Sequence, residues 1–270
     1  MKYENLKGVS ESKFKRAVGV NREIFEFQVA ILEDALKEKH KKGGRPPKLP
    51  TEDILLLMYN YYRDYNTFLK LGLYFEIDES NAYRWIKWCE SILQSYMSED
   101  FDISKINIQN ELIVDVMECL IQRPKIYEIQ REYYSGKKKK HTIKIQVIIE
   151  EKTKKIVGVA FGKGSVHDFS LFQKSTKELD TLAKFLADSG YQGILKLFPN
   201  SLTPKKKSKN NPLSTEDKEL NHLISSNRIA IEHTNSQLKI FKILSERYRN
   251  RIGTFFPRAI FICSLYNFQL

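Results

Sequence analysis

Two aspartates stand in segments of the chain where an ionised side chain is unexpected. Asp115 interrupts residues 112–117, a short run that is otherwise apolar and rich in β-branched residues and therefore predicts a buried strand. Asp188 ends residues 184–188, a further predicted strand that a Ser-Gly pair closes. A buried carboxylate is costly unless it is paired or binds a metal, and α/β folds place their sites at the carboxyl ends of strands. Both aspartates are therefore candidate catalytic residues.

A third carboxylate lies on a helix predicted over residues 222–245. Four residues share one face of this helix because they follow one another at spacings of four, three and four. They are Arg228, Glu232, Asn235 and Lys239. A stripe of this composition is also typical of an ordinary solvated helix face. The pattern by itself leaves open whether Glu232 is a catalytic or a surface residue.

Three carboxylates gathered in one place would supply the oxygen ligands that Mg²⁺ prefers. Two such ions about 3.5–4 Å apart can activate the attacking oxygen and stabilise the leaving oxygen of a phosphodiester. We therefore expect Asp115, Asp188 and Glu232 to be both the catalytic residues and the metal ligands, with two ions of Mg²⁺ or Mn²⁺. Lys239 would then contact a DNA phosphate, and Arg228 would orient Glu232 or hold phosphate itself.

The elements that carry these residues predict an α/β layered domain over residues 105–270. Strands are expected at 112–117, 142–149, 155–161 and 184–188, and helices at 168–183, 222–245 and 257–268. Residues 200–219 are polar and loop-like and contain three consecutive lysines. Three strands, a helix, a strand and then helices would bring the two aspartates and the helix stripe into one domain.

The chain before residue 100 predicts helices alone. Residues 1–42 form a helical region, since apolar residues from Phe25 to Leu36 recur at helical spacing. Residues 43–50 contain two glycines and three prolines, which predict a linker. Residues 51–100 predict a helix from Thr51, a short helix at 66–75, a tight turn and a third helix that Asp78 or Ser80 caps.

Helix, short turn and helix form the pattern of a helix-turn-helix DNA-binding domain. The leading end of its last helix would then enter the major groove of DNA. The side chains expected there are Asn81, Tyr83, Arg84 and Lys87. A plain helical bundle gives the same pattern, so the two interpretations stand level here.

Charge and composition favour a nucleic-acid partner. Lys plus Arg total 45 and Asp plus Glu total 33, so the net charge of the 270 residues is +12, and excess positive charge attracts polyanions. No apolar run approaches the roughly 20 residues of a membrane span, and the N-terminus lacks the apolar stretch of a signal peptide. The three cysteines are too few and too far apart for a disulfide framework or a zinc site, which predicts free thiols in a reducing cytosol.

Four motifs, in this order, resemble those of a known family. They are Val114-Asp115-Val116, the basic segment from Tyr133 to Thr142, Ala187-Asp188-Ser189-Gly190-Tyr191, and Arg228-x3-Glu232-x6-Lys239. Over nearly its whole length the chain resembles bacterial insertion-sequence transposases of the DDE class, in the Harbinger-related group. One departure is Ser225, because related transposases carry a tyrosine three residues before the arginine.

The resemblance implies an α/β RNase H-like catalytic domain, a mixed sheet with flanking helices, preceded by an all-α helix-turn-helix DNA-binding domain. It implies a protein that binds the terminal inverted repeats of its element, cleaves DNA with metal-activated water and joins the 3′-hydroxyl to target DNA. The expected partners are double-stranded DNA and further copies of the chain on that DNA, with no membrane, in the bacterial cytoplasm at the nucleoid. The alternatives are a DNA-binding protein or a nuclease that does not join strands.

Secondary candidates surround this core set. His167 and Asp168 precede a helix, as a similar pair does in related transposases, and Asp168 is read as a helix cap that could instead be the second acid. The run from Lys137 to Lys140 suits phosphate contacts, although a solvated turn has the same composition. Trp85 and Trp88, three residues apart, are typical of a helix core.

Overall fold

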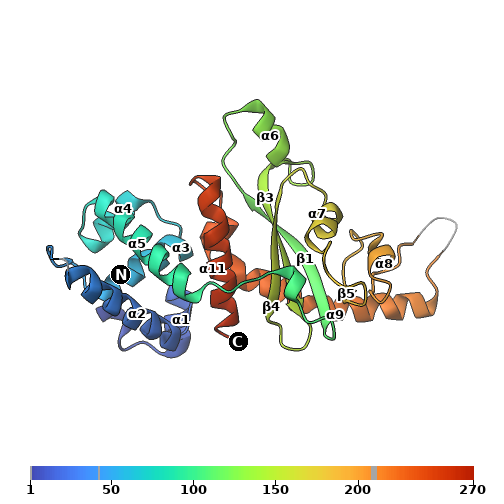
Figure 1. The fold of residues 1–270 in the computed structure, drawn as a ribbon, viewed down its shortest axis with the longest axis horizontal. Helices are drawn as coiled ribbons and strands as arrows, with labels where there is room; N and C mark the ends of the chain where they lie inside the picture. The colour runs from blue at the N-terminus through green and yellow to red at the C-terminus, as the bar shows by residue number, and fades with distance from the viewer. Residues whose placement is uncertain (1, 42, 208–211) are drawn as a thin grey trace. The chain divides into compact units, whose positions relative to one another are not determined.

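The computed structural model describes residues 2–41, 43–207 and 212–270. The ends of the predicted region 1–42 and part of the predicted loop 200–219 therefore lie outside the described residues. The chain forms two compact units (Figure 1). One comprises Met1–Glu99, Lys239–Glu246 and Asn250–Gln269, and the other comprises Asp100–Leu238, Arg247–Arg249 and Leu270.

The first unit is helical. Its elements are η1 (Tyr3–Leu6), α1 (Glu11–Val18), α2 (Arg22–Lys41), α3 (Thr51–Arg63), α4 (Phe68–Phe75), α5 (Glu79–Met97), α10 (Lys242–Ser245), η3 (Ile252–Thr254) and α11 (Phe255–Asn267). Residues 43–50 contain neither helix nor strand, as their glycines and prolines predict. Helix α3 is the centre of this unit, because its side chains from Ile54 to Tyr59 are all buried.

A short turn joins α4 to α5. The side chain of Thr67 caps α4 by accepting a hydrogen bond from the Lys70 backbone, and Asp78 caps α5 by accepting one of 2.8 Å from the Ser80 backbone. Gly72 lies against the turn, where an added Cβ would stand 2.7 Å from the Ile77 carbonyl oxygen. The local signals thus produce the predicted helix, turn and helix.

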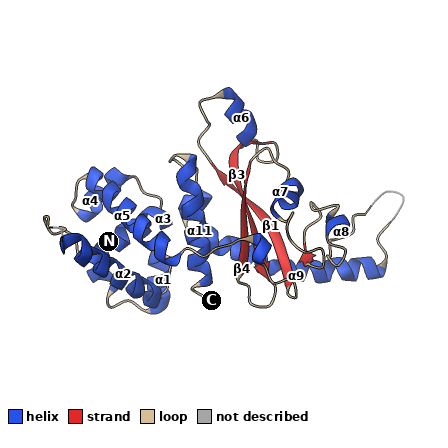
Figure 2. Cartoon of the chain, viewed as in Figure 1, coloured by secondary structure: helices blue, strands red, loops and turns tan. Residues whose placement is uncertain are grey.

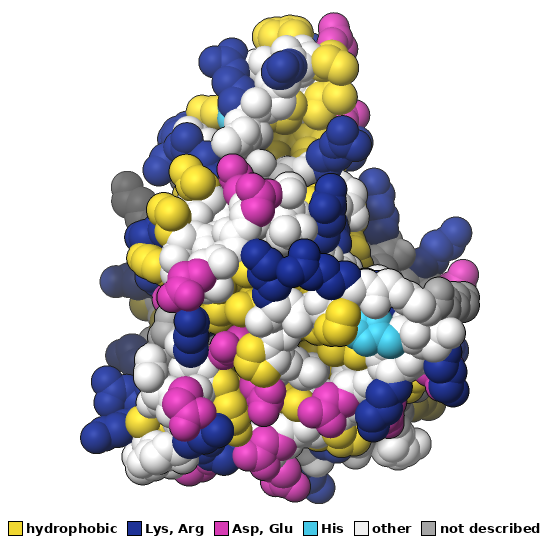
Figure 3. Space-filling model, turned by 90° about the vertical axis from the view of Figure 1, so that its left-hand side faces the viewer, with side chains coloured by type: hydrophobic (Ala, Val, Ile, Leu, Met, Phe, Trp, Pro, Cys, Tyr) yellow, Lys and Arg dark blue, Asp and Glu magenta, His cyan; other side chains and the backbone are white. Residues whose placement is uncertain are grey.

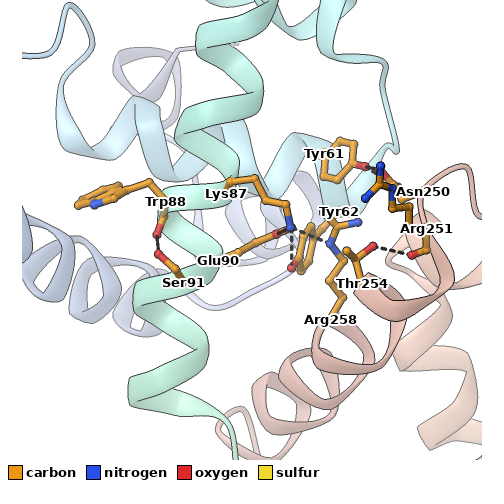
Figure 4. A network of polar contacts seen from close by, with 10 residues as sticks. All are labelled: Tyr61, Tyr62, Lys87, Trp88, Glu90, Ser91, Asn250, Arg251, Thr254 and Arg258. Atoms are coloured by element: carbon orange, nitrogen blue, oxygen red, sulfur yellow. Dashed lines mark hydrogen bonds and ion pairs between the residues drawn. The ribbon is translucent and has the colours of Figure 1, made fainter.

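The end of the chain packs into this helical unit, which differs from the predicted domain of residues 105–270. Arg258 of α11 is 2% exposed and donates a 2.7 Å hydrogen bond from Nε to Glu90 of α5. Tyr62 also donates to Glu90, and Lys87 pairs with its other carboxylate oxygen at 2.8 Å (Figure 4). A buried charge needs partners of this kind, so the cluster ties α11 to α3 and α5.

The second unit is a mixed sheet with flanking helices (Figure 2). Its elements are η2 (Ile103–Lys105), β1 (Glu111–Leu120), α6 (Tyr127–Tyr133), β2 (Tyr134–Ser135), β3 (Lys140–Glu150), β4 (Ile156–Lys163), α7 (Asp168–Ser175), β5 (Lys184–Leu186), α8 (Ile194–Leu197) and α9 (Thr215–Lys239). Strand β3 pairs antiparallel with β1, β2 and β4, whereas β5 runs parallel to β1.

An apolar core fills the space between the sheet and α7. Leu112 and Val114 of β1 pack against Phe172 of α7 in one buried cluster. Phe185 of β5 and Tyr191, which follows β5, belong to the same cluster. The mixed sheet, its helices and the helical N-terminal unit confirm the predicted fold class. Within residues 2–41, 43–207 and 212–270, no helix is both long enough and apolar enough to cross a bilayer.

Two helices differ in extent from the expectation, and one helix was not predicted. Helix α7 ends at Ser175 rather than 183, the predicted helix 222–245 is divided into α9 (Thr215–Lys239) and α10 (Lys242–Ser245), and the short helix α6 lies between β1 and β2. The side chain of Thr176, just past α7, bonds back to the carbonyl of Phe172, and residues 176–183 continue as turns and coil. These differences leave the strands and helix that carry the candidate acids in place.

Candidate active site

The parallel pairing of β1 and β5 positions Asp115 and Asp188. Ile113 of β1 lies opposite Leu186 of β5, so each aspartate follows this pair by two residues along its own segment. Beyond β5 the chain turns sharply, and the Asp188 carboxylate accepts a 2.7 Å hydrogen bond from the Gly190 backbone. A Cβ on Gly190 would stand 2.9 Å from that carboxylate oxygen. The glycine therefore leaves room for the carboxylate in this turn.

Helix α9 contacts Asp115 through the predicted stripe. Asn235 donates a 2.9 Å hydrogen bond from Nδ2 to Asp115 Oδ2, and Arg228 Nη2 lies 3.8 Å from Oδ1. Ile231 and Leu238, at 0% and 1% exposure, anchor α9 to the core beside these contacts. The stripe is therefore a face of the helix that contacts the sheet at Asp115, which excludes a wholly solvated face.

Glu232 and Lys239 belong to the same stripe but are exposed. Glu232 lies one turn beyond Arg228 and makes no hydrogen bond or ion pair with any residue that the structure describes. Lys239 is the last residue of α9. The structure therefore brings Arg228 and Asn235 to Asp115 and leaves the Glu232 carboxylate open to solvent.

Three carboxylates influence one another around Asp115. Burial raises the pKa of Asp115, the Arg228 guanidinium opposes this shift, and the charges of Asp188 and Asp168 add to it. The pKa of Tyr191 is also raised, first by burial and then by Asp115, Asp168 and Asp188. The ionised carboxylates are thus crowded in an environment that one arginine compensates only in part.

Asp168 has a partner of its own. Lys144 of β3, whose side chain is 8% exposed, donates a 2.7 Å hydrogen bond to the Asp168 carboxylate. The helix cap of α7 is His167, whose ring nitrogen accepts from the Phe169 backbone at 3.3 Å. The expectation that Asp168 caps the helix is therefore wrong, because Asp168 is the first helical residue and its carboxylate is turned to Lys144.

The donors around Asp115 fit a divalent cation in kind. Besides the carboxylates, Asn235 Oδ1 and the Tyr191 hydroxyl are buried without a hydrogen-bond partner among the described residues. An oxygen that has lost water and gained no partner is energetically costly, and a hard cation is one partner that would satisfy it. In the described ranges, however, no three His, Cys, Asp or Glu side chains stand ready to hold one ion.

Some of the residues that are predicted to contact DNA bases are exposed at the N-terminal end of α5. Asn81, Tyr83 and Arg84 are exposed, and Arg84 contacts the Asn81 amide oxygen at 3.4 Å. Lys87 differs, because its ammonium is paired with the buried Glu90. Three side chains thus stay open to solvent at this end of the helix.

Trp85 and Trp88 are half-buried and pack edge to face at 5.4 Å beneath the ammonium of Lys39. They therefore contact Lys39 of α2 and are not part of the buried helix core that the sequence indicates.

Positive charge is spread widely. Lys137, Lys138, Lys139 and Lys140 are all exposed, in and beside the turn that joins β2 to β3 in an antiparallel hairpin. Figure 3 shows Lys and Arg side chains over much of the face drawn, with Asp and Glu side chains and hydrophobic side chains among them. Cys89, Cys119 and Cys263 are buried, and none of the three forms a disulfide within the described residues.

Two contributors to the site were not among the sequence candidates. Tyr191 lies within the Asp-Ser-Gly-Tyr motif, so its position beside Asp188 was visible, but its burial was not. Lys144 alternates with apolar neighbours in a strand, and nothing in its surroundings signals an ion pair with a residue 24 positions away.

Two protein families and one known protein match this chain in sequence. Residues 114–267 match the family described as DDE superfamily endonuclease, and residues 47–99 match the helix-turn-helix of the DDE superfamily endonuclease. A protein of Microchaete diplosiphon named "Probable transposase for insertion sequence element IS702" is 41% identical over 275 residues, covering 100% of this chain and 99% of that protein.

Two solved structures show weaker likenesses. A piggyBac transposase synaptic complex with hairpin DNA has a TM-score of 0.48 at 11% identity, covering 97% of this chain and 75% of that chain. A pre-cleavage Mos1 transpososome has a TM-score of 0.25 at 11% identity, covering 85% and 83%. The assignment of the chain to a family rests on the family match and on the 41% identical relative, and not on these two structures. By these two observations the chain belongs to the DDE superfamily endonucleases, as an insertion-sequence DNA transposase with an N-terminal helix-turn-helix.

Proposed function

We propose that this transposase binds the terminal inverted repeats of its own element, cleaves a phosphodiester at the element end with water, and joins the freed 3′-hydroxyl to target DNA. The single observation that carries the proposal is the contact of Arg228 and Asn235 with Asp115, beside the turn that holds Asp188. The strand transfer is a transesterification, in which the 3′-hydroxyl oxygen attacks a target phosphorus and a target strand oxygen leaves.

In this proposal Asp115, Asp188 and Glu232 are the catalytic acids and the metal ligands. Asn235 fixes the Asp115 carboxylate with a hydrogen bond, and Arg228 balances part of its charge. Glu232 is exposed one turn from Arg228, where a carboxylate can meet both solvent and DNA. Two ions of Mg²⁺ or Mn²⁺ would activate the attacking oxygen and stabilise the leaving one.

The DNA would be held by residues other than the proposed acids Asp115, Asp188 and Glu232. Asn81, Tyr83 and Arg84 are exposed at the leading end of α5 and would read bases in the major groove, whereas Lys87 would contribute less because Glu90 neutralises it. The lysines from Lys137 to Lys140, together with Arg228 and Lys239, would contact phosphates. Because two ends of one element must be joined to the same target, we propose that several copies of the chain act together on DNA.

The test is Glu232→Gln, which keeps the length of the side chain and removes its charge. We expect DNA binding to persist, because phosphates attract Lys and Arg rather than Glu232. Cleavage of end DNA in Mg²⁺ should fall by several orders of magnitude. The lost charge would weaken the binding of the ions that activate the attacking oxygen and stabilise the leaving oxygen. Cleavage is measured on a duplex carrying the terminal inverted repeat, and binding by gel shift on the same duplex.

Glu219→Gln is the matched control. Glu219 is exposed on α9 thirteen residues before Glu232, which turns it to the opposite side of the helix at 100° per residue. This variant should cleave and bind as the unaltered protein does. Normal cleavage by Glu232→Gln would refute the assigned site, and a strand-transfer assay that yields cleavage without joining would favour the nuclease alternative.

A further inference from the structure

A cavity lies in the sheet unit at the beginning of β3, where His141 stands six residues before Val147, the partner of Asp115. Figure 1 shows α6 beside this end of β3. Its volume is about 450 Å³, within the range of about 300–1,000 Å³ that small-molecule sites occupy. Six side chains line it: Arg123, Tyr127, Gln130, Arg131, Tyr134 and His141. Two arginines, three aromatic rings and one amide, with no carboxylate among them, form an unusual lining for a surface hollow.

Two of the three rings, Tyr134 and His141, contact each other, and the third, Tyr127, is largely exposed. Tyr134 and His141 face each other across the β2–β3 pair, with ring centroids 5.6 Å apart and planes at 71°. Tyr127 of α6 is 67% exposed and Tyr134 is 42% exposed. Large aromatic faces left in water at a concave site are available for stacking. Burial and the neighbouring Arg123 lower the pKa of His141, which favours the neutral form of its ring.

The cations of the cavity are positioned but not neutralised. Arg123 donates two hydrogen bonds, of 3.0 Å from Nε and 2.8 Å from Nη2, to the Gln130 amide oxygen. Gln130 in turn donates a 2.8 Å bond to the Pro124 carbonyl. Arg123 therefore keeps its full charge and further N–H donors while its guanidinium is held in place. Arg131 makes no ion pair or hydrogen bond through its side chain with any described residue.

A nucleotide combines the two features that this lining recognises. Its base has a flat π-face that stacks on Tyr or His, and its phosphate pairs with a guanidinium. The exposed lysines from Lys137 to Lys140 begin three residues after Tyr134 in the same hairpin, so a DNA backbone held by them would pass the cavity. A base inside an intact duplex has both faces covered, and therefore only an unstacked base can enter.

From these contacts we infer that the cavity between α6 and the β2–β3 hairpin binds one unstacked nucleotide of DNA, with its base against Tyr127, Tyr134 and His141 and its phosphate at Arg123 and Arg131. This inference rests on the proposed function, since strand cleavage and joining at an element end create distorted DNA. The inference adds a binding site for an unstacked nucleotide that is separate from the proposed acids Asp115, Asp188 and Glu232. The occupant is recognised by its base and phosphate, whatever the sequence of the end.

The test measures binding of the full chain in EDTA at fixed salt, by fluorescence anisotropy, to three duplexes. The first carries one unpaired thymidine, the second carries an abasic residue at that position, and the third is fully paired. Base stacking on an aromatic side chain is worth a factor of about 5 to 150 in affinity. We expect the thymidine duplex to bind more tightly than the abasic duplex by a factor in this range.

Variants of the cavity should remove this preference without removing general binding. The double variant Tyr127→Ala/Tyr134→Ala should bring the thymidine-to-abasic ratio to about one and leave affinity for the paired duplex within about twofold, because stacking acts only on an unstacked base. Tyr134→Phe keeps the ring and should keep the preference. The control is Tyr96→Ala, which removes a tyrosine that is 72% exposed on α5 and should leave the ratio unchanged.

Equal binding of the thymidine and abasic duplexes by the unaltered protein would overturn the inference, and so would a preference that survives in the folded double variant. Circular dichroism establishes that the variants fold, and Tyr134→Phe provides the comparison if the double variant does not. Because the assay contains no metal, failure of end cleavage would refute the proposed function alone. Normal cleavage with a ratio of one would refute this inference alone.

Discussion

Asp115 illustrates at the scale of one residue how a proposed catalytic position conflicts with stability. Its carboxylate is mostly buried, and Asp188 and Asp168 repel its charge, so its pKa is raised despite Arg228. A carboxyl with a raised pKa in the folded state contributes stability below its unfolded pKa, and that contribution is lost as the pH rises through the folded pKa. At neutral pH the ionised residue therefore costs the protein stability.

We accordingly expect Asp115→Asn to raise the melting temperature in EDTA at pH 7 by a few degrees. The amide still accepts the Asn235 hydrogen bond and carries no charge to bury. The gain should shrink as the pH falls through the raised folded-state pKa of Asp115, and it should vanish below the ordinary pKa of an aspartate, where the residue is neutral in both states. Adding Mg²⁺ should stabilise the unaltered protein more than the variant, since only the former keeps the charged ligand. Differential scanning calorimetry across pH measures both effects, and a variant less stable than its parent at pH 7 would contradict them.

Replacing each aspartate by asparagine distinguishes the role of Asp188 from that of Asp168. Asp188→Asn keeps the 2.7 Å bond from the Gly190 backbone, so stability should change little while end cleavage is lost. Asp168→Asn leaves the buried Lys144 ammonium without its counter-charge, which should cost about 1–3 kcal/mol of unfolding free energy. Urea unfolding and end cleavage are measured on both variants. The reverse outcome, with cleavage lost only in a stable Asp168→Asn, would make Asp168 the second catalytic acid.

At the scale of elements, the β2–β3 hairpin is a compact source of positive charge. The lysines from Lys137 to Lys140 are all exposed, and among the described residues none of these four ammonium groups forms an ion pair. Lys139 has a φ of 54°, so the hairpin turns sharply and presents its side chains within a short span. Such a turn suits a DNA backbone because each lysine can meet a separate phosphate.

Replacing these four lysines by glutamine should weaken binding to every DNA sequence alike. Each lost phosphate contact lowers the slope of log affinity against log salt by about 0.9, so the quadruple variant should lose about 3–4 from that slope. Arg84→Ala should instead reduce the preference for end DNA over unrelated DNA and change the slope by about one or less. Titrations over a range of salt concentrations compare the two variants. An unchanged slope in the quadruple variant would show that the hairpin does not contact DNA.

At the scale of the whole molecule, the helical unit is built from both ends of the sequence. The side chains of Phe255, Phe261, Ile262 and Leu265 on α11 are at most 1% exposed. Helix α11 packs on α5, and the buried pair of Arg258 and Glu90 crosses between them. The helical unit that contains the helix-turn-helix is therefore completed by residues that follow α9 in the chain.

Deleting residues 1–99 should consequently leave a chain that does not fold as an independent catalytic domain. Helix α11 would lose its apolar partners, and Arg258 would lose the carboxylate that compensates its burial. We expect the truncated protein to aggregate or to bind a hydrophobic dye strongly, with end cleavage lost. Light scattering and dye fluorescence measure this against the full chain. A monomeric truncated protein with a cooperative thermal transition would contradict the expectation.

Much of the fold and part of the candidate site could be predicted from local pattern. The strand around Asp115, the helix-turn-helix and the stripe on α9 all follow from the alternation or helical spacing of neighbouring residues. The boundaries at 183 and 222 were wrong because short polar segments carry no periodicity that separates helix from coil. Helix α6 was missed for the same reason, and with it the cavity that its tyrosine lines.

What the sequence by itself determined is therefore local: which segments alternate, which faces of helices are apolar, and the order of the acids along the chain. Tertiary structure decided which distant groups meet. It paired Lys144 with Asp168, turned Asn235 to Asp115, buried the Tyr191 hydroxyl near three aspartates and packed α11 on α5. The physical reason is that burial and charge compensation depend on what the whole fold places around a group, and adjacent residues along the chain do not report it.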